Sequence, residues 1–142
     1  MVEIKWNKNI EEDSKIEIEK YLNPFLWLIP KWCQSITINV YDSDDQGAAI
    51  ATLVTYEYRY ITVDFFSAWF IQTPSVKQDN VIHECIHFFI NEIYHKGRQI
   101  VKSTCKDNEQ LKEFAFEELR IAVESSTQDL AFAIQNKFNG RT

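Results

Sequence analysis

The sequence predicts a small α+β domain in which strands precede two long helices. Between residues 35 and 66, apolar residues alternate with polar ones or are β-branched and aromatic, which is typical of strands. From residue 76 onward, apolar residues recur every three to four positions, which is typical of amphipathic helices. We therefore expect a small, mostly antiparallel three-stranded sheet packed with an N-terminal helix, a middle helix and a long C-terminal helix.

The first helix is expected near the N-terminus. Residues 11–22 mix strong helix formers with apolar residues. Asn23-Pro24 then predicts a cap and a new first turn before residues 25–29, and Pro30 ends that piece.

Three strands are expected next. Residues 35–41 alternate in polarity, which predicts a strand with one buried face, and residues 42–47 are rich in turn formers. We expect a second strand over residues 48–56 and a third over residues 59–66. The Glu57-Tyr58 step between them leaves room only for a tight hairpin, so these two strands should pair antiparallel.

The remaining chain predicts two helices and a connection. After a loop at Thr73-Pro74-Ser75, a helix is expected over residues 76–94, with a polar connection containing Gly97 over residues 95–108. A long helix then covers residues 109–138 and stops at Asn139-Gly140. The expected core residues of the two helices are Ile82, Ile86, Phe89 and Ile93, then Phe116, Leu119, Val123, Leu130 and Ile134.

Composition and charge restrict the class of protein. The chain has 142 residues, of which 45% are apolar, so residues 1–142 are expected to form one domain with a real core. A formal charge of −6 argues against nucleic acid as a partner. The sequence contains neither a signal peptide nor an apolar stretch of membrane-spanning length, and its three cysteines are odd in number and widely spaced. We expect a cytoplasmic protein with reduced thiols and no membrane contact.

The pentapeptide His83-Glu84-Cys85-Ile86-His87 matches the H-E-x-x-H pattern inside the first long helix. At about 100° per residue, His83 and His87 project from one face of a helix and can hold a single zinc ion. Glu84 lies beside them, where a carboxylate can act as a general base toward a water activated by the metal. Cys85 points to the opposite side, so we interpret it as core packing rather than as a ligand.

A third ligand must come from elsewhere, because catalytic zinc usually has three protein ligands. The extended motif with a third histidine is absent, since Ile90 and Ile93 occupy its glycine and histidine positions. The C-terminal helix offers a polar line, with apolar flanks, that contains Glu117 and Glu124. Such a line suits a carboxylate pointing into a metal pocket, but a surface ladder of Glu117, Arg120 and Glu124 fits it as well.

The H-E-x-x-H helix followed by a glutamate on a later helix resembles the gluzincin type of zincin metallopeptidase. The chain is most similar to the very small, single-domain zincin-like proteins common in phage and prophage genomes. The resemblance covers residues 58–135: a strand at 59–66, the motif helix at 81–89, and Glu124 followed by Thr127, Leu130 and Ile134 in core positions. It implies that Glu124 is the third zinc ligand, with Glu117 and then Glu118 as alternatives.

The resemblance also implies how a substrate binds. The strand before the motif helix would be the edge along which an extended peptide adds as another strand. Asn91 and Tyr94 continue the histidine face, so they are candidates to line the cleft, and His95 is a further candidate. The stretch from residue 95 to 106 carries four basic residues and no acid before Asp107, and we interpret it as a solvated basic connection, an acidic partner being the alternative.

We therefore expect a zinc-dependent peptidase that hydrolyses peptide or amide bonds, with Glu84 as the catalytic base and His83, His87 and Glu124 as the metal ligands. The partner would be a peptide or protein substrate. A non-catalytic, phage-derived binding or regulatory protein with structural zinc is the alternative, and an accidental motif is the third. The intact Glu84 argues against a purely structural site, which does not need a base.

Overall fold

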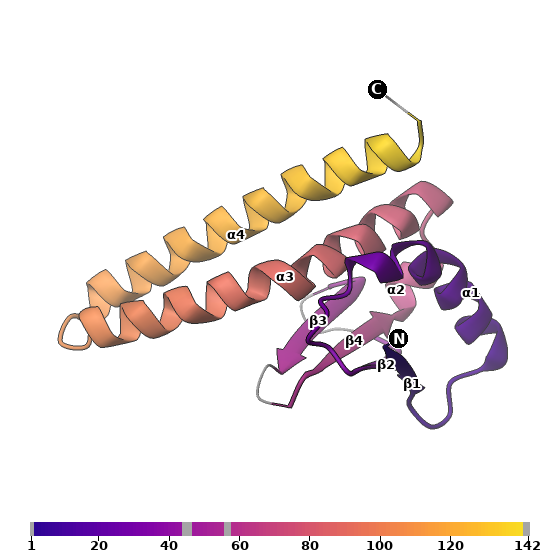
Figure 1. The fold of residues 1–142 in the computed structure, drawn as a ribbon, viewed down its shortest axis with the longest axis horizontal. Helices are drawn as coiled ribbons and strands as arrows, with labels where there is room; N and C mark the ends of the chain where they lie inside the picture. Colours follow the sequence, from indigo (N-terminus) through magenta and orange to yellow (C-terminus); the bar gives the residue numbers. More distant parts are fainter. Residues whose placement is uncertain (1, 44–46, 56–57, 141–142) are drawn as a thin grey trace.

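The computed structural model describes residues 2–43, 47–55 and 58–140. They form an α+β fold, as predicted, with one four-stranded sheet in the order β1-β2-β4-β3 (Figure 1). The strands are β1 (Glu3–Trp6), β2 (Ser35–Tyr41), β3 (Ile50–Thr55) and β4 (Tyr60–Phe66). β3 pairs antiparallel with β4, while β2 lies parallel to both β4 and β1. The expectation of a mostly antiparallel, three-stranded sheet was wrong, because the sheet is mixed and has a fourth strand.

The missed strand β1 (Glu3–Trp6) is only four residues long and contributes no fully buried side chain. Its parallel partner β2 begins some thirty residues later, so the pairing needs a crossover that local periodicity cannot reveal. The antiparallel pairing of β3 with β4 was predicted and is confirmed. Parts of the two expected turns, residues 44–46 and 56–57, lie outside the described residues.

The crossover between β1 and β2 consists of α1 (Glu12–Leu22) and the 3-10 helix η1 (Asn23–Leu28), with Pro24 in its first turn as predicted. After β4 a short helix, α2 (Ser67–Phe70), which the sequence did not indicate, leads into α3 (Pro74–Thr104). The chain ends in α4 (Glu109–Phe138), followed by Gly140 in the left-handed region at φ +68°. The stop at Asn139-Gly140 is therefore confirmed.

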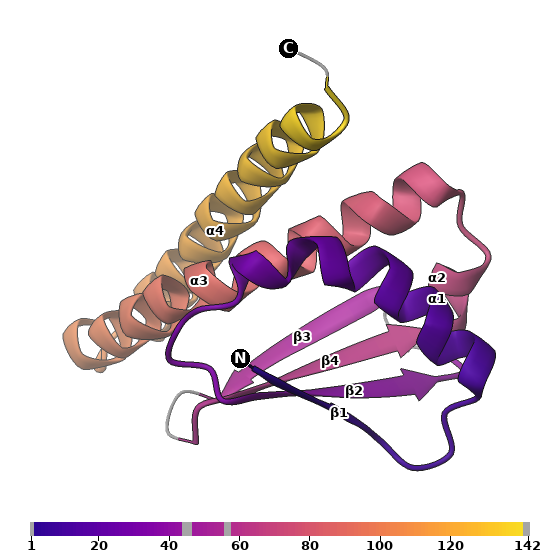
Figure 2. The same cartoon turned by 45° about the vertical axis from the view of Figure 1, so that its right-hand side comes forward.

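The helices α1, η1 and α3 cover one face of the sheet, and the core lies between these two layers (Figure 2). Ile36, Ile38, Ile61, Val63 and Phe65 point from β2 and β4 into that core. Alternate residues of a strand point to opposite sides, so the other face of the sheet carries polar side chains such as Thr37, Asn39 and Asp64. There the Asn39 amide donates to Asp64 (2.7 Å) and its oxygen accepts from Asn7 (2.8 Å).

The start of α3 is anchored by buried contacts with α1 and α2. Trp69 in α2 is fully buried, and its indole N–H donates to the Lys77 carbonyl at 3.3 Å. The Lys77 ammonium lies 5.3 Å from the centre of the Trp69 ring and forms an ion pair with Glu17 of α1. These contacts help to fix how α3 crosses the sheet, and so where its third and fourth turns present their side chains.

Helices α3 and α4 form a long antiparallel hairpin whose tip extends past the sheet (Figures 1 and 2). The expectation of a connection over residues 95–108 was wrong, because α3 continues to Thr104. Gly97 lies inside the helix, where a Cβ atom would come within 2.8 Å of Leu119 Cδ2. Gly97 therefore does not end the helix, and the absence of a side chain at this position permits a close approach of α4. The turn between α3 and α4 is short, and Asn108 caps α4.

Burial also corrects several expected core residues of the hairpin. Phe89, Ile93 and Leu130 are 47%, 67% and 48% exposed, because the faces that carry them turn away from the sheet and from the partner helix. On α4 the buried line consists of Val123, Thr127 and Ala131, spaced four residues apart. None of the helices in the described part of the chain contains an apolar stretch that could cross a bilayer.

Candidate metal centre

Three side chains of α3 come together over the sheet. His83, Glu84 and His87 offer ligand atoms that all lie within 4.8 Å of one another. The Nε2 atoms of His83 and His87 are 3.1 Å apart, because residues four apart stand one above the other on a helix. Cys85, between them, is 1% exposed and contributes to the core instead, as predicted.

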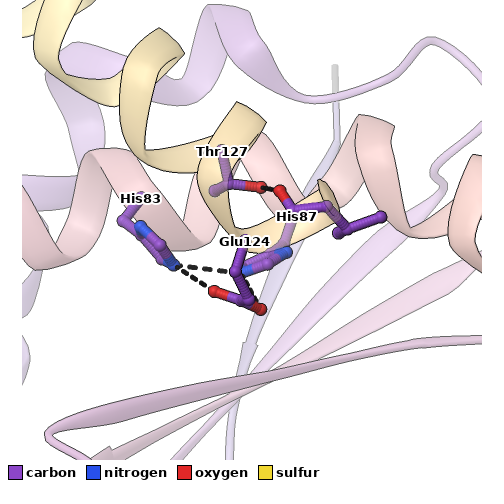
Figure 3. A network of polar contacts seen from close by, with 5 residues as sticks. His83, His87, Glu124 and Thr127 are labelled. Carbon is purple, nitrogen blue, oxygen red and sulfur yellow. Dashed lines mark hydrogen bonds and ion pairs between the residues drawn. The ribbon is translucent and has the colours of Figure 1, made fainter. Parts of the chain in front are cut away.

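Helix α4 adds a carboxylate to the same space. Glu124 Oε2 lies 3.4 Å from His83 Nε2, and its other oxygen lies 3.6 Å from His87 Nε2 (Figure 3). Thr127, one turn along α4, is fully buried, and its hydroxyl donates its proton to the Val123 carbonyl at 2.8 Å. This hydroxyl proton is therefore not donated to the Glu124 carboxylate. The antiparallel hairpin thus brings Glu124 to residues some forty positions earlier in the chain.

The separations among these atoms are close to those of a metal site. Zinc binds imidazole nitrogen and carboxylate oxygen at about 2.0–2.2 Å, so neighbouring ligand atoms in a tetrahedral site lie about 3.3–3.5 Å apart. The two histidine nitrogens are 3.1 Å apart, and they lie 3.4 and 3.6 Å from different oxygens of the Glu124 carboxylate. A set of two imidazoles and one carboxylate suits zinc and also several other first-row divalent metals. These residues therefore fit a three-ligand metal site.

The electrostatics of His87 favour the neutral imidazole that a metal needs. Burial lowers the pKa of His87, the Glu124 carboxylate opposes this shift, and the charge of His83 reinforces it. Its Nδ1 is buried and has no hydrogen-bond partner of normal geometry among the described residues. Metal-ligating histidines usually donate their second ring N–H, and the side chain of Asn91, one turn further on in the lining of the site, interacts with His87 and raises its pKa.

Glu84 is a half-buried carboxylate without a cationic partner in the described part of the chain. Burial raises its pKa from 4.5 to about 7, the Thr52 hydroxyl of β3 opposes this rise, and the negative charge of Glu124 adds to it. The Thr52 oxygen is itself buried and makes no hydrogen bond of normal geometry with any described residue. A carboxyl group whose pKa is raised to near 7 by its surroundings is a common feature of functional sites.

The candidate ligands open onto a cleft of about 430 Å³ between α3 and β3, which we call the α3–β3 cleft. In the sheet order, β3 is the outer strand and β4 is paired on both sides. The expectation that the strand directly before the motif helix forms the edge was therefore wrong, and the edge at the cleft is β3. The cleft is lined by Ala51, Thr52, Leu53, Val54, Glu84, His87, Asn91, Tyr94, His95, Arg98 and Glu124.

The three candidates for the third ligand, Glu124, Glu117 and Glu118, differ in their position relative to the cleft. Glu124 faces the histidines, whereas Glu117 accepts two hydrogen bonds from Arg120, at 2.9 and 2.6 Å, on the exposed side of α4. This pairing lowers the pKa of Glu117. Glu118 is exposed as well. Part of the alternative surface ladder is therefore present, as the Glu117–Arg120 pair, but Glu124 points away from it into the site.

Arg98 and the residues of β3, among them Thr52, were not predicted from the sequence to line the cleft. Asn91, Tyr94 and His95 were expected in the wall, and Arg98 continues their line at the far end. The helical spacing from His87 through Asn91 and Tyr94 to Arg98 could have indicated it, had Gly97 not suggested a connection. Thr52 carried no local signal, because only the sheet order brings β3 to the motif helix.

Comparison with known proteins gives no further assignment. No family model, no curated protein and no solved structure matches this chain. Any functional conclusion therefore depends on the site itself.

Proposed function

We propose that this protein is a zinc-dependent peptidase that hydrolyses peptide or amide bonds. One observation carries the proposal: two histidine nitrogens that face the Glu124 carboxylate open, together with the half-buried carboxylate of Glu84, onto a cleft bordered by an edge strand. The histidines and Glu124 are suited to hold a metal, the Glu84 carboxylate is suited to act as a hydrolytic base, and the edge strand can pair with an extended substrate. The resemblance of the H-E-x-x-H helix to gluzincins agrees with this function.

In this proposal His83, His87 and Glu124 hold the metal. When bound, zinc would supply a Lewis acid and lower the pKa of a coordinated water to about 7. Glu84 takes the proton of the attacking water and passes it to the leaving amine, a role that requires an ionised carboxylate. The positive charge of a metal would favour that ionised form and oppose the effect of burial on Glu84.

The substrate would be a peptide or protein segment that lies along β3 and adds to the sheet as a further strand. Residues 51–54 of β3 line the cleft opposite α3, so a peptide paired there would pass beside Glu84. Tyr94 and Asn91, on the same wall, are candidates to donate a hydrogen bond to the developing oxyanion. The negative net charge gives no reason to expect nucleic acid as a partner.

The test combines metal analysis with an activity screen. Purified protein should contain close to one zinc per chain, and His83→Ala and His87→Ala should both lose it. Glu84→Gln retains size and hydrogen bonding but cannot accept the proton, so it should keep its zinc while hydrolysis of casein or short peptides falls by about 10²–10⁴. Unchanged metal content in both histidine variants, or hydrolysis by Glu84→Gln at the wild-type rate, would exclude the proposal.

A second candidate function follows from the position of Glu84. Its carboxylate lies within 4.8 Å of both imidazoles, so with Glu124 it could complete a closed site of four protein ligands. Closed sites are typical of structural zinc, and the protein would then be a non-catalytic binding or regulatory protein. In that case Glu84→Gln should weaken zinc binding strongly, whereas the peptidase proposal expects little change.

A cytoplasmic location is part of the proposal. Cys33, Cys85 and Cys105 are all free thiols, and Cys33 and Cys85 are buried, which fits a reducing compartment. Cell fractionation would test this location.

A further inference from the structure

The two ends of the α3–β3 cleft differ in charge. Glu84 and Glu124 lie at the metal end, whereas Arg98, the lining residue of α3 nearest to the end of that helix at Thr104, lies at the far end. Arg120 of α4 lies near the same end, but it is paired with Glu117, so Arg98 is the cation that lines the cleft there. A substrate that fills the cleft would therefore meet a cationic end.

Arg98 is held in position by neutral groups. One guanidinium nitrogen donates to the Tyr94 hydroxyl at 3.0 Å. Its central carbon lies 4.2 Å from the centre of the Phe116 ring of α4 and 5.5 Å from that of Tyr94. Aromatic rings orient a guanidinium and attract it, but they leave its charge and most of its donors available to a ligand.

No carboxylate pairs with Arg98 in the part of the chain that the structure describes. The ion pairs of the hairpin involve other residues, and Glu117, which follows Phe116, is engaged with Arg120. Partly buried arginines with fixed, planar donors are suited to bidentate recognition of carboxylates. An oriented guanidinium without an acidic partner, in the wall of a cleft, is thus an available carboxylate-binding group.

We propose that Arg98 determines specificity by binding a carboxylate of the substrate, so that the peptides preferred by this site carry an acidic side chain or a free C-terminus at the far end of the cleft. This inference rests on the proposed peptidase function, because it assigns the substrate class of that same site. The two sources of a carboxylate share one chemistry and are separated by the test below.

The position of the carboxylate relative to the metal follows from helix geometry. Arg98 follows His87 by eleven residues, which corresponds to about 16 Å along the axis of α3. Side chains on a helix lean toward its N-terminus, so the guanidinium lies somewhat closer to the metal end than its Cα atom. An extended peptide advances about 3.3 Å per residue, so the carboxylate should lie about three to five residues from the scissile bond.

The experiment measures binding without cleavage. Zinc-loaded Glu84→Gln protein is titrated with fluorescent decapeptides that carry one Asp or Glu at each position in turn, and with matched Asn or Gln peptides. A second series compares free with amidated C-termini. We expect acidic or free-carboxylate peptides to bind about 10-fold or more tightly than their neutral counterparts, at one or two positions only, as is typical of a charged hydrogen-bonded pair.

Variants of Arg98 then identify the group responsible. Arg98→Gln, in the Glu84→Gln background, should abolish the preference, and Arg98→Lys should retain part of it, since the charge remains but the planar fork is lost. Lys96→Gln is the matched control: it removes the same charge from the same helix on a face outside the cleft, and should leave the preference unchanged. Thermal unfolding of each variant verifies the fold.

The outcomes separate this inference from the proposed function. Equal binding of acidic and neutral peptides, no binding of either, or a preference that survives Arg98→Gln would overturn the role of Arg98. If wild-type protein hydrolyses peptides without any acidic preference, the inference fails and the peptidase function stands. If Arg98-dependent binding is found and wild-type protein hydrolyses none of the bound peptides, the peptidase function fails and the carboxylate site stands.

Discussion

Glu84 gives a prediction for the metal-free protein. Its pKa is raised from 4.5 to about 7, mainly by burial, so the folded chain holds this proton over a pH range in which the unfolded chain releases it. Between these two pKa values the folded state binds more protons than the unfolded state. The free energy of unfolding that depends on Glu84 is therefore largest at low pH and is lost as the pH rises toward and past 7.

The size of this effect follows from the two pKa values. Linkage between pH 5 and pH 8 gives about 2–3 kcal/mol for a carboxyl group that titrates at 4.5 when unfolded and near 7 when folded. Glu84→Gln removes the titration and retains the shape of the side chain. The stability of the variant relative to the wild type should thus increase by about 2–3 kcal/mol from pH 5 to pH 8.

The assay is urea denaturation of both proteins, in the presence of a chelator, at several pH values across this range. Comparison of the two proteins cancels the titration of every shared group that does not interact with Glu84, so the difference reports Glu84 together with the groups coupled to it, such as Glu124. A constant difference in the free energy of unfolding from pH 5 to pH 8 would refute the reasoning, because it would mean that Glu84 ionises normally in the folded protein. Saturating zinc should reduce the effect, since a bound cation stabilises the carboxylate.

Three further predictions concern the ligands and the packing around them. Glu124→Ala should lower zinc affinity at least 10-fold, measured by competition with a chelating dye, whereas Glu117→Ala should change it little, because Glu117 faces Arg120 and solvent; the reverse ranking would contradict the site. Cys85→Ala should retain zinc and lose about 1 kcal/mol of stability in urea through lost packing, and zinc loss from the folded variant would contradict this. Gly97→Val should cost about 1 kcal/mol, since its Cβ atom would lie 2.8 Å from Cδ2 at the end of the half-buried Leu119 side chain, which must shift, and an unchanged unfolding midpoint would disprove that close contact.

Much of the candidate site was predictable from local sequence. The angle between two side chains on a helix depends only on their spacing, so His83 and His87 had to share a face, and Cys85 had to lie on the other side. The same rule gave α4 a polar line between apolar flanks, which includes Glu124. The interpretation of Glu124 as the carboxylate nearest the histidines used nothing beyond periodicity and the resemblance to gluzincins, and its role as a ligand stays a prediction.

Only the tertiary structure decided which of these faces meet. The sequence could not show that β1 joins the sheet or that β3, rather than β4, forms its edge, because strand order depends on pairing between distant segments. Gly97 is equally compatible with a chain break and with close helix packing, and the contact with Leu119 settles which applies. Phe89 and Leu130 follow a helical apolar pattern yet remain exposed, since periodicity defines a stripe but not what covers it. Arg98 lines the cleft because α3 continues past residue 94 to Thr104. Packing against α4, which is distant in sequence, stabilises this part of α3 and could not be predicted from local sequence.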